Sequence, residues 1–494
     1  MIKKKMPNAL TGRVRFLGVM ACVLCFLASM KSVAAADTGA AQRAVEGAKK
    51  YAGITLTIEY QAGLQAQDPL RYSGPRWEKE TGIKIRVVEV PLAEVFSKIM
   101  LDYRSGGGGF DVVDVVPSWM PDLAQAGALE PLDVYVDRYD YRNELNQIAP
   151  TFRDNWMVAN GKIYAFPDDG DVLILYYRKD IFGDPGNQAA FKAKYRYDLA
   201  PPKTWKQFTE IGGFLTERLK AQGIYGASAV RDPAFAQYMF QERFRNQGGR
   251  FFNLESMKAT INSPVGVKVF TDMREENHFM PPGVENFKFA ENLAVFLNGQ
   301  SAMTISWPPV GRWAAGYSAD EKLLAFVPAS KVAGKVGYAL PPGGHPELAI
   351  GHALSVASTS KNKEAAYLFI QWMNSEEISA KRVQLPYTLR DPFRTSHYSN
   401  PEYLAKWPDA KDYLGTLKAA SEIGLFDLSL LQTDKYEEVL RLGFSRLWAG
   451  EDPKAILDDM AKQWDEHTQR VGVEKQRAVY TAWEAKPGAY PKGH

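Results

Sequence analysis

Near the start of the chain, the hydrophobic pattern alternates between the two-residue period of a strand and the longer period of a helix. Residues 54–60 (ITLTIEY) and 83–90 alternate apolar with polar positions and are rich in β-branched side chains, which predicts strands. Residues 77–82 and 91–105 predict helices, the second with its apolar side chains on one face. Residues 111–116 (DVVDVV) predict a third, buried strand. This order of elements predicts an α/β domain with a largely parallel sheet.

Later segments continue the alternation without an internal repeat. Residues 302–307 and 349–358 predict strands, and a helix is expected to begin after Pro202 with Thr204 as its cap. The polar residues 475–494, which contain proline and glycine, predict a loosely packed tail. Further helices are expected over residues 362–372, over 436–448 and from 452 onward.

The first 36 residues have the composition of a secretory signal. Five basic residues precede an uncharged apolar stretch at 16–30. Three alanines at 34–36 form a small-residue cleavage site. The apolar stretch has 15 residues, fewer than the roughly 20 that a membrane-spanning helix needs. We therefore expect residues 1–36 to be removed on export, which leaves no membrane span. The alternatives are a retained membrane anchor and lipidation at Cys22.

Removal of this signal changes the charge and the cysteine content. Six basic residues and no acidic ones leave with it, so the formal charge falls from +3 to −3 and no electrostatic case for nucleic-acid binding remains. Both cysteines, Cys22 and Cys25, also leave, so the exported chain needs no disulfide. The remaining 458 residues are enough for two or three domains.

Seven segments, in order, resemble a known family. Each is weak alone, but their order and spacing are specific. The chain resembles the bacterial extracellular solute-binding proteins of family 1, the sugar-binding subunits of ABC importers. The segments are residues 77–85 (WEKETGIKI), 110–115 (FDVVDV), 161–167 (GKIYAFP), 175–182 (LYYRKDIF), 201–208 (PPKTWKQF), 299–307 (GQSAMTISW) and 361–372 (KNKEAAYLFIQW).

The resemblance implies a periplasmic binding protein-like type II fold, with two α/β lobes joined by a hinge that the chain crosses more than once. It implies an N-terminal lobe at 37–168 plus 353–400, a C-terminal lobe at 172–350 plus 410–474, and a tail at 475–494. The lobes are expected to close around a ligand. It further implies a monomer in the periplasm that captures a sugar or polyol, passes it to a membrane permease, and has no enzymatic activity and no cofactor.

A sugar site needs flat aromatic surfaces for the C–H faces of the ring and polar groups for its hydroxyls. Ligands of α/β sheets lie beyond the carboxyl ends of the strands, which selects residues after 60 and after 116. The resemblance adds the acidic run at 168–171, the strand end near 307 and cleft segments near 351 and 390. The expected ligand-binding residues are Gln61, Trp119, Asp169, Asp171, Trp307, Gly351, His352 and Arg390.

A structural explanation competes with each of these assignments. The acidic run fits a solvated turn, Trp119 fits a packing residue, and Arg390 fits a surface ion pair. His352 fits a core histidine with satisfied hydrogen bonds. It also stands where the family often has an aromatic residue, so stacking is not expected there.

Two other functions remain open. Trp119, Trp307 and Trp313 suit an aromatic cage for a quaternary amine. Asp169 and Asp171 suit a secreted glycoside hydrolase, although neighbouring strand positions point their side chains in opposite directions. The six histidines show no metal-ligand spacing, and no calcium loop is present at 168–171, so no metal is expected.

Overall fold

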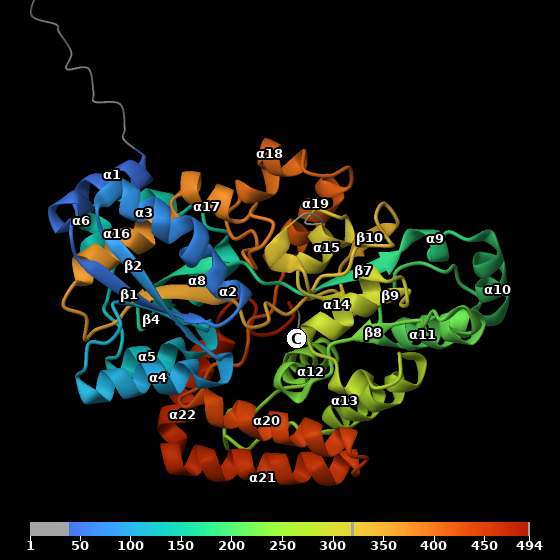
Figure 1. Ribbon diagram of the computed structural model, residues 1–494. Coiled ribbons are helices and arrows are strands. Elements are labelled where there is room, and N and C mark those ends of the chain that lie inside the picture. Colours follow the sequence, from blue (N-terminus) through green and yellow to red (C-terminus); the bar gives the residue numbers. More distant parts are fainter. Residues whose placement is uncertain (1–38, 318–320, 493–494) are drawn as a thin grey trace, which may run out of the picture. The chain divides into compact units, whose positions relative to one another are not determined.

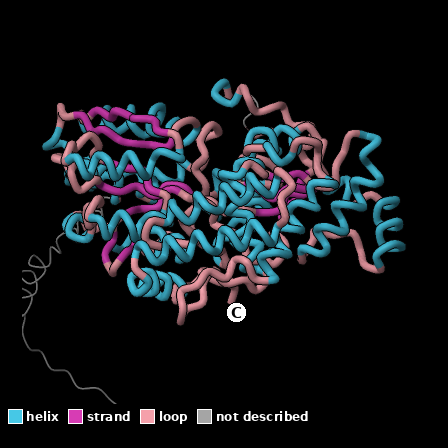
Figure 2. Tube along the Cα trace, turned by 90° about the horizontal axis from the view of Figure 1, so that it is seen from below, coloured by secondary structure: helices cyan, strands magenta, loops and turns pink. Residues whose placement is uncertain are grey.

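The strands of the protein fall into two mixed sheets and one small hairpin. The computed structural model describes residues 39–317 and 321–492, so the expected signal at 1–36 lies outside the described residues. Figure 2 shows the strands of the two sheets as separate groups. The first sheet has the order β2 (Lys84–Val90), β1 (Thr55–Gln61), β3 (Val112–Val115), β11 (His352–Val356), β6 (Ala165–Asp169). The second has the order β10 (Val336–Ala339), β7 (Ile174–Arg178), β9 (Met303–Ser306), β8 (Ser228–Ala229), and the hairpin joins β4 (Val158–Ala159) to β5 (Lys162–Ile163).

The pairing of the strands in the first sheet agrees with the sequence prediction except at β11. β1 pairs in parallel with β2 and β3, as expected. β11 inserts between β3 and β6 and runs antiparallel to both. In the second sheet β7 runs antiparallel to both of its neighbours, and β8 and β9 are parallel. The expectation of a largely parallel sheet is therefore confirmed for the first sheet, in which β11 alone of the five described strands runs the other way, because the chain leaves this sheet after β6 and re-enters it from the opposite direction.

Helices cover both faces of the first sheet, with α4 and α5 on one face and α1, α3 and α16 on the other (Figure 1). Covering both faces also buries the polar positions of β1, so Thr57 and Glu59 are only 8% and 0% exposed. Burial, together with the charge of Asp114, raises the pKa of Glu59 to about 9. The helices on this side are α1 (Ala40–Ala48), α2 (Leu64–Asp68), α3 (Gly74–Thr81), α4 (Leu92–Ser105), α5 (Met120–Ala126), α6 (Asp133–Arg138), α7 (Arg142–Leu145), α8 (Pro150–Trp156), α16 (Lys363–Asn374) and α17 (Glu376–Arg382).

A second set of helices surrounds the four-stranded sheet. The Thr204 side chain accepts a hydrogen bond from the Gln207 amide, which confirms the expected cap of α11. These helices are α9 (Lys179–Phe182), α10 (Pro185–Tyr195), α11 (Trp205–Leu219), α12 (Pro233–Asn246), α13 (Pro264–Glu275), α14 (Phe289–Leu297), α15 (Pro309–Ala314), α18 (Pro401–Leu404) and α19 (Ala410–Glu422). Among the described residues, no helix is long and apolar enough to cross a membrane.

The chain ends in three helices: α20 (Thr433–Trp448), α21 (Pro453–Val471) and α22 (Val473–Glu484). α20 and α21 lie side by side at the bottom of Figure 1. The expectation of a loosely packed tail at 475–494 is wrong for its described part. α22 buries Tyr480 and Trp483, and the indole N–H of Trp483 donates to the Asp427 carbonyl at 2.9 Å. Burial of these aromatic side chains on one face of the helix holds the segment against the protein, although most of its residues are polar.

Candidate functional site

The facing edges of the two sheets meet where the chain passes between them. β1, β3 and β6 end at this edge and β11 begins there, and β8 and β9 of the second sheet end towards it. Residues 170–173 carry the chain from β6 to β7, and residues 340–351 carry it from β10 to β11. In open α/β sheets, ligands bind beyond the carboxyl ends of the strands, so this is the region in which to look for a site.

A cavity of about 120 Å³, called the ligand cavity below, lies between these edges. Four polar side chains and six apolar ones form its wall, and they come from strands of the first sheet, from helices and from connecting segments. The polar residues are Gln61, Gln65, Asp171 and His352, and the apolar ones are Phe235, Phe289, Trp307, Pro309, Ile350 and Leu389. The structure therefore brings together Gln61, Asp171, Trp307 and His352 of the residues expected from the sequence.

Asp171 lies in the crossing segment and is buried. Its Oδ2 atom accepts a hydrogen bond from the Gly351 amide at 3.3 Å. Burial, and then the charges of Asp169 and Asp391, raise its pKa well above the ordinary value. A carboxyl group kept protonated in this way donates a hydrogen bond as well as accepting one.

His352 is held by Asp114. Nδ1 of the imidazole lies 3.0 Å from both carboxylate oxygens of Asp114. Burial opposes the charged imidazolium, but the Asp114 carboxylate outweighs it and raises the pKa of His352 above its ordinary value. Because Nδ1 donates to Asp114, Nε2 is the ring atom left for the cavity, and in the charged form it is a donor.

Gln61 and Gln65 provide acceptors. The backbone N–H of Gln61 donates to Asp114 at 3.2 Å, and the side-chain Nε2 of Gln65 donates to Asp169 at 2.9 Å. The side-chain oxygens of both glutamines are buried and have no hydrogen-bond partner among the described residues. An unpartnered buried oxygen costs about 1–3 kcal/mol, so each of these atoms favours a ligand that donates to it.

Aromatic rings form the opposite wall. The indole N–H of Trp307 donates to the Ala349 carbonyl at 3.1 Å, which leaves the apolar surface of the ring for the cavity. Phe235 and Phe289 pack edge-on against Trp307, with ring centroids 5.8 and 6.1 Å away. The site thus has one apolar wall and one wall of hydrogen-bonding groups.

Four expected residues do not line this cavity. Both oxygens of Asp169 are occupied, one by Gln65 and the other by the Asp391 amide at 2.7 Å. Trp119 is buried and packs edge-on against Phe96, with ring centroids 5.7 Å apart. Gly351 contributes its amide to Asp171 and lies between two residues that do line the cavity.

Arg390 is the fourth. It is fully buried, donates to the Gln65 carbonyl at 2.8 Å and pairs with Asp168 at 2.9 Å. It is neither a surface ion pair nor a residue of the cavity wall. Its hydrogen bond to the Gln65 carbonyl instead holds α2, the helix that carries Gln65, in position.

Asp169, Asp171 and Asp391 form a buried acidic cluster, in which one oxygen of each lies within 4.8 Å of the others. The expectation that Asp169 and Asp171 point in opposite directions is therefore wrong. β6 ends at Asp169, and the chain bends at Gly170, whose amide donates to the Asp391 carbonyl at 3.1 Å. Arg312 pairs with Asp391 at 3.1 Å and compensates part of the negative charge.

Gln65, Phe235, Phe289, Pro309 and Leu389 were not expected at the site. Gln65 follows the first strand by four residues, within the segment where strand-end reasoning already pointed. The others come from segments that reach the cavity only through folding, and their apolar types are those of ordinary core residues. No local pattern distinguishes them.

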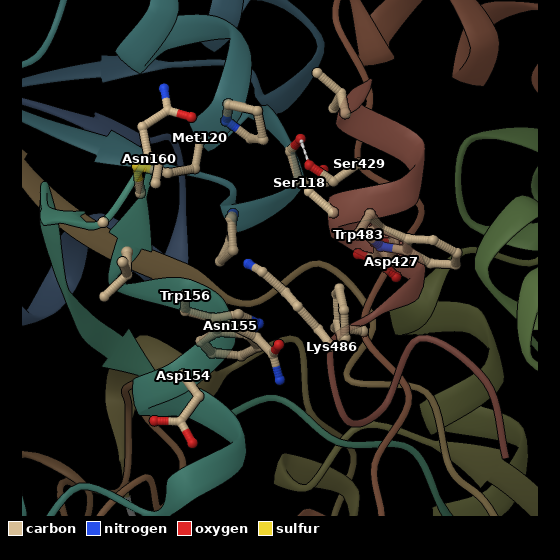
Figure 3. Close-up of a pocket in the computed structure, with 18 of the residues that line it drawn as sticks. Ser118, Met120, Asp154, Asn155, Trp156, Asn160, Asp427, Ser429, Trp483 and Lys486 are labelled. Carbon is tan, nitrogen blue, oxygen red and sulfur yellow. Dashed lines mark hydrogen bonds between the residues drawn. The ribbon is translucent and has the colours of Figure 1, made fainter. Parts of the chain in front are cut away.

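A second cavity, of about 320 Å³, shares Ile350 with the ligand cavity. Figure 3 shows the residues that line this second cavity. It is bounded by residues 117–121, by the hairpin region at 154–161, by residues 426–429 and by α22. None of the eight expected ligand-binding residues lines this second cavity, but Pro117 and Ser118, which follow the third predicted strand, do. It is larger than the ligand cavity, but neither Asp171 nor His352 lines it.

Two relatives are similar over most of the chain. A probable amino-acid ABC transporter periplasmic-binding protein of Sinorhizobium fredii is 25% identical over 398 residues, covering 74% of this chain and 84% of the relative. A mannitol-binding protein of Pseudomonas aeruginosa is 25% identical over 341 residues, covering 65% and 69%.

The fold is shared with solved structures. An ABC transporter solute-binding protein of Agrobacterium radiobacter in complex with ribitol has a TM-score of 0.69 and 23% identity, covering 84% of this chain and 99% of that one. The expected type II binding-protein fold is thereby confirmed. The model of one family, described as bacterial extracellular solute-binding protein, matches residues 40–380. The chain therefore belongs to the bacterial extracellular solute-binding proteins.

Proposed function

We propose that the protein captures a small sugar or polyol in the ligand cavity and delivers it to the permease of an ABC importer. The observation that carries this proposal is that one cavity is lined both by acceptors that lack partners and by groups that can donate. Among the described residues, the side-chain oxygens of Gln61 and Gln65 lack partners, while Asp171 and His352 can donate. A hydroxyl group both donates and accepts, so a chain of adjacent hydroxyls can satisfy both kinds of group.

The size of the cavity supports a small ligand. Its volume of about 120 Å³ is below the roughly 300–1,000 Å³ of pockets that hold drug-sized molecules. A monosaccharide or a linear polyol of similar length suits this space better than an oligosaccharide. Trp307, Phe235 and Phe289 would cover the C–H face of such a ligand.

The relatives support the same class. One is named for mannitol, and one solved neighbour holds ribitol, both of which are linear polyols. Another relative is named for amino acids. Among the described residues that line it, the ligand cavity has no arginine or lysine to hold an α-carboxylate, and the nearby Arg390 and Arg312 are both engaged by aspartates, which favours the polyol.

Location and partner follow from the signal and the family. Residues 1–36 support export to the periplasm, where family members act, and a monomer that meets a membrane permease is the expected form. We propose that the protein has no catalytic activity of its own.

The two alternatives are disfavoured by particular residues. A hydrolase would need two carboxyl groups at the ligand, but Asp169 lies outside the cavity wall with both oxygens occupied. The cage expected from Trp119, Trp307 and Trp313 is not assembled, because Trp307 is the one tryptophan among the described residues of the wall. The N–H of Trp313 donates to Pro386, and Trp119 packs on Phe96.

A thermal-shift panel tests the proposal. The exported protein would be mixed with ribitol, D-mannitol, D-sorbitol, D-glucose, maltose, glycine betaine and amino acids. A ligand at 100 times its Kd stabilises the native state by about 2.7 kcal/mol, which raises Tm measurably. We expect a polyol or a monosaccharide to raise Tm and maltose to have no effect. A response to betaine or amino acids alone would overturn the ligand class, and turnover of chromogenic glycosides that Asp171→Asn abolishes would overturn the binding role.

A further inference from the structure

The second cavity contains polar atoms that the fold leaves without partners. Oγ of Ser118 and Oδ1 of Asn155 are buried and accept no hydrogen bond from the described residues, and their residues are 4% and 6% exposed. The amide nitrogen of Asn155, in contrast, is engaged by the carbonyls of Thr151 and Pro487. Both residues line the cavity, so a ligand that donates two hydrogen bonds after a small rotation of these side chains would satisfy the two oxygens.

Lys486 supplies a positive charge to the same space. Its side chain extends into the cavity (Figure 3). Burial lowers its pKa, while the exposed carboxylate of Asp154 acts in the opposite direction. Within the described part of the chain the ammonium forms no ion pair, and it lies 5.8 Å from the centroid of the Phe426 ring. An anionic group bound here would offset the cost of burying this charge.

Two tryptophans complete the wall. Trp156 and Trp483 both line the cavity, and the N–H of Trp483 is already used by the Asp427 carbonyl. Their ring faces are therefore the surfaces available to a ligand. Burial and the charge of Glu347 raise the pKa of Asp427 well above its ordinary value, so this carboxyl does not repel an anion.

A short backbone segment connects the two cavities. The Ile350 amide donates to Oδ2 of Asp427, on the wall of the second cavity, at 3.0 Å. The next amide, of Gly351, donates to Oδ2 of Asp171, on the wall of the ligand cavity, at 3.3 Å. Both residues have positive φ, +72° and +63°, and a β-branched residue rarely adopts this conformation. The bend persists because carboxyl groups from both cavities hold its amides.

We propose that the second cavity is a binding site for a small hydroxy acid, and that its occupancy tightens binding in the ligand cavity. The carboxylate would pair with Lys486, two hydroxyls would donate to Ser118 and Asn155, and the carbon chain would lie against the tryptophan rings. Ile350 lines both cavities, and each cavity holds one of the two carboxyl groups that bond to the bend at 350–351. A ligand in either cavity therefore favours the same arrangement of this bend. The coupling part of the proposal rests on the polyol function; the site itself does not.

Titration calorimetry with sodium D-gluconate tests the site. D-Sorbitol is the matched control, because it has the same carbon chain and hydroxyls with CH₂OH in place of the carboxylate. In the exported protein, we expect gluconate to bind and Lys486→Met to weaken it by at least about tenfold. Ala482→Phe, which fills the mouth of the cavity, should abolish it. Trp307→Ala, in the ligand cavity, should leave gluconate binding unchanged.

The coupling is measured by a second titration. Saturating gluconate should lower the Kd of D-mannitol by at least about fivefold in the wild-type protein and have no effect in Lys486→Met. Mannitol binding without gluconate should be the same in both proteins, which shows that the variant is folded.

Three results would overturn the proposal. The first is no binding of gluconate, D-glucuronate or glycerate at millimolar concentration. The second is gluconate binding that survives Lys486→Met and Ala482→Phe but is lost in Trp307→Ala, which would place it in the ligand cavity. The third, an unchanged mannitol Kd, would remove the coupling. If no polyol binds at all while gluconate binding depends on Lys486, the site stands and the proposed polyol function fails.

Discussion

His352 and Asp114 form a buried ion pair across strands β11 and β3, with Nδ1 of the imidazole 3.0 Å from each carboxylate oxygen. The same carboxylate accepts a hydrogen bond from the amide of Gln61. One acidic side chain thus positions two residues of the ligand cavity that come from distant parts of the chain. Asp114 itself lies outside the cavity wall, so it acts on a ligand through its neighbours.

Replacing Asp114 with asparagine should lower the pKa of His352. The carboxylate is what raises this pKa against the effect of burial. A raised native-state pKa stabilises the fold fully below the ordinary value of 6.5, and this stabilisation is lost as pH rises through the native-state pKa. The stability difference between the wild-type protein and the variant should therefore be largest in acid. NMR titration of His352 and pH-dependent unfolding measure the two effects, and an unchanged His352 pKa would contradict the role of Asp114.

Asp171→Asn should stabilise the protein at neutral pH. In the unfolded chain this carboxyl ionises near its ordinary pKa of 3.8, whereas burial keeps the folded one protonated. The folded state then binds more protons than the unfolded state, so the free energy of unfolding falls as pH rises above 3.8 towards the native-state pKa. Asparagine removes this dependence. Denaturant unfolding at pH 4 and pH 7 should show a gain that is larger at pH 7, and a loss of stability at pH 7 would contradict a protonated Asp171.

Trp307→Ala should weaken polyol binding by at least about tenfold, or about 1.4 kcal/mol, because it removes the centre of the aromatic wall. Trp307→Phe keeps a ring there and should bind within a few-fold of the wild-type protein. Trp313→Phe provides a control outside the cavity wall. Calorimetry with the best ligand of the panel measures all three variants. If the Trp307→Ala variant and the wild-type protein had equal affinities, this wall would be excluded from the site.

Trp483→Ala should lower the free energy of unfolding by about 3–5 kcal/mol, as expected for a large buried aromatic residue. It would also remove the hydrogen bond to the Asp427 carbonyl. Lys475→Ala, at an exposed position of the same helix, should change stability by no more than about 0.5 kcal/mol. If denaturant unfolding gave the two variants equal stability, α22 would be as loosely packed as the composition of residues 475–494 suggests.

Local patterns predicted the elements of the fold well, because each depends on neighbouring residues. The strand at 55–61, the helix at 92–105 and the Thr204 cap all lie where periodicity and capping chemistry indicate. Prediction failed where partners are distant. The antiparallel entry of β11 and the burial of α22 depend on surfaces contributed by remote parts of the chain.

For the candidate site, the sequence by itself determined the chemistry of the region: an acidic run, strand-end tryptophans and an order of segments that belongs to one family. Only the tertiary structure decided which of these groups face the cavity. Asp171 lines it and Asp169 does not, although their carboxyl groups lie close together: Asp171 accepts a hydrogen bond from the Gly351 amide beside the cavity, whereas both oxygens of Asp169 are bound by Gln65 and the Asp391 amide. Hydrogen bonds between segments more than a hundred residues apart decide which carboxyl group faces the cavity, and no local sequence pattern encodes these bonds.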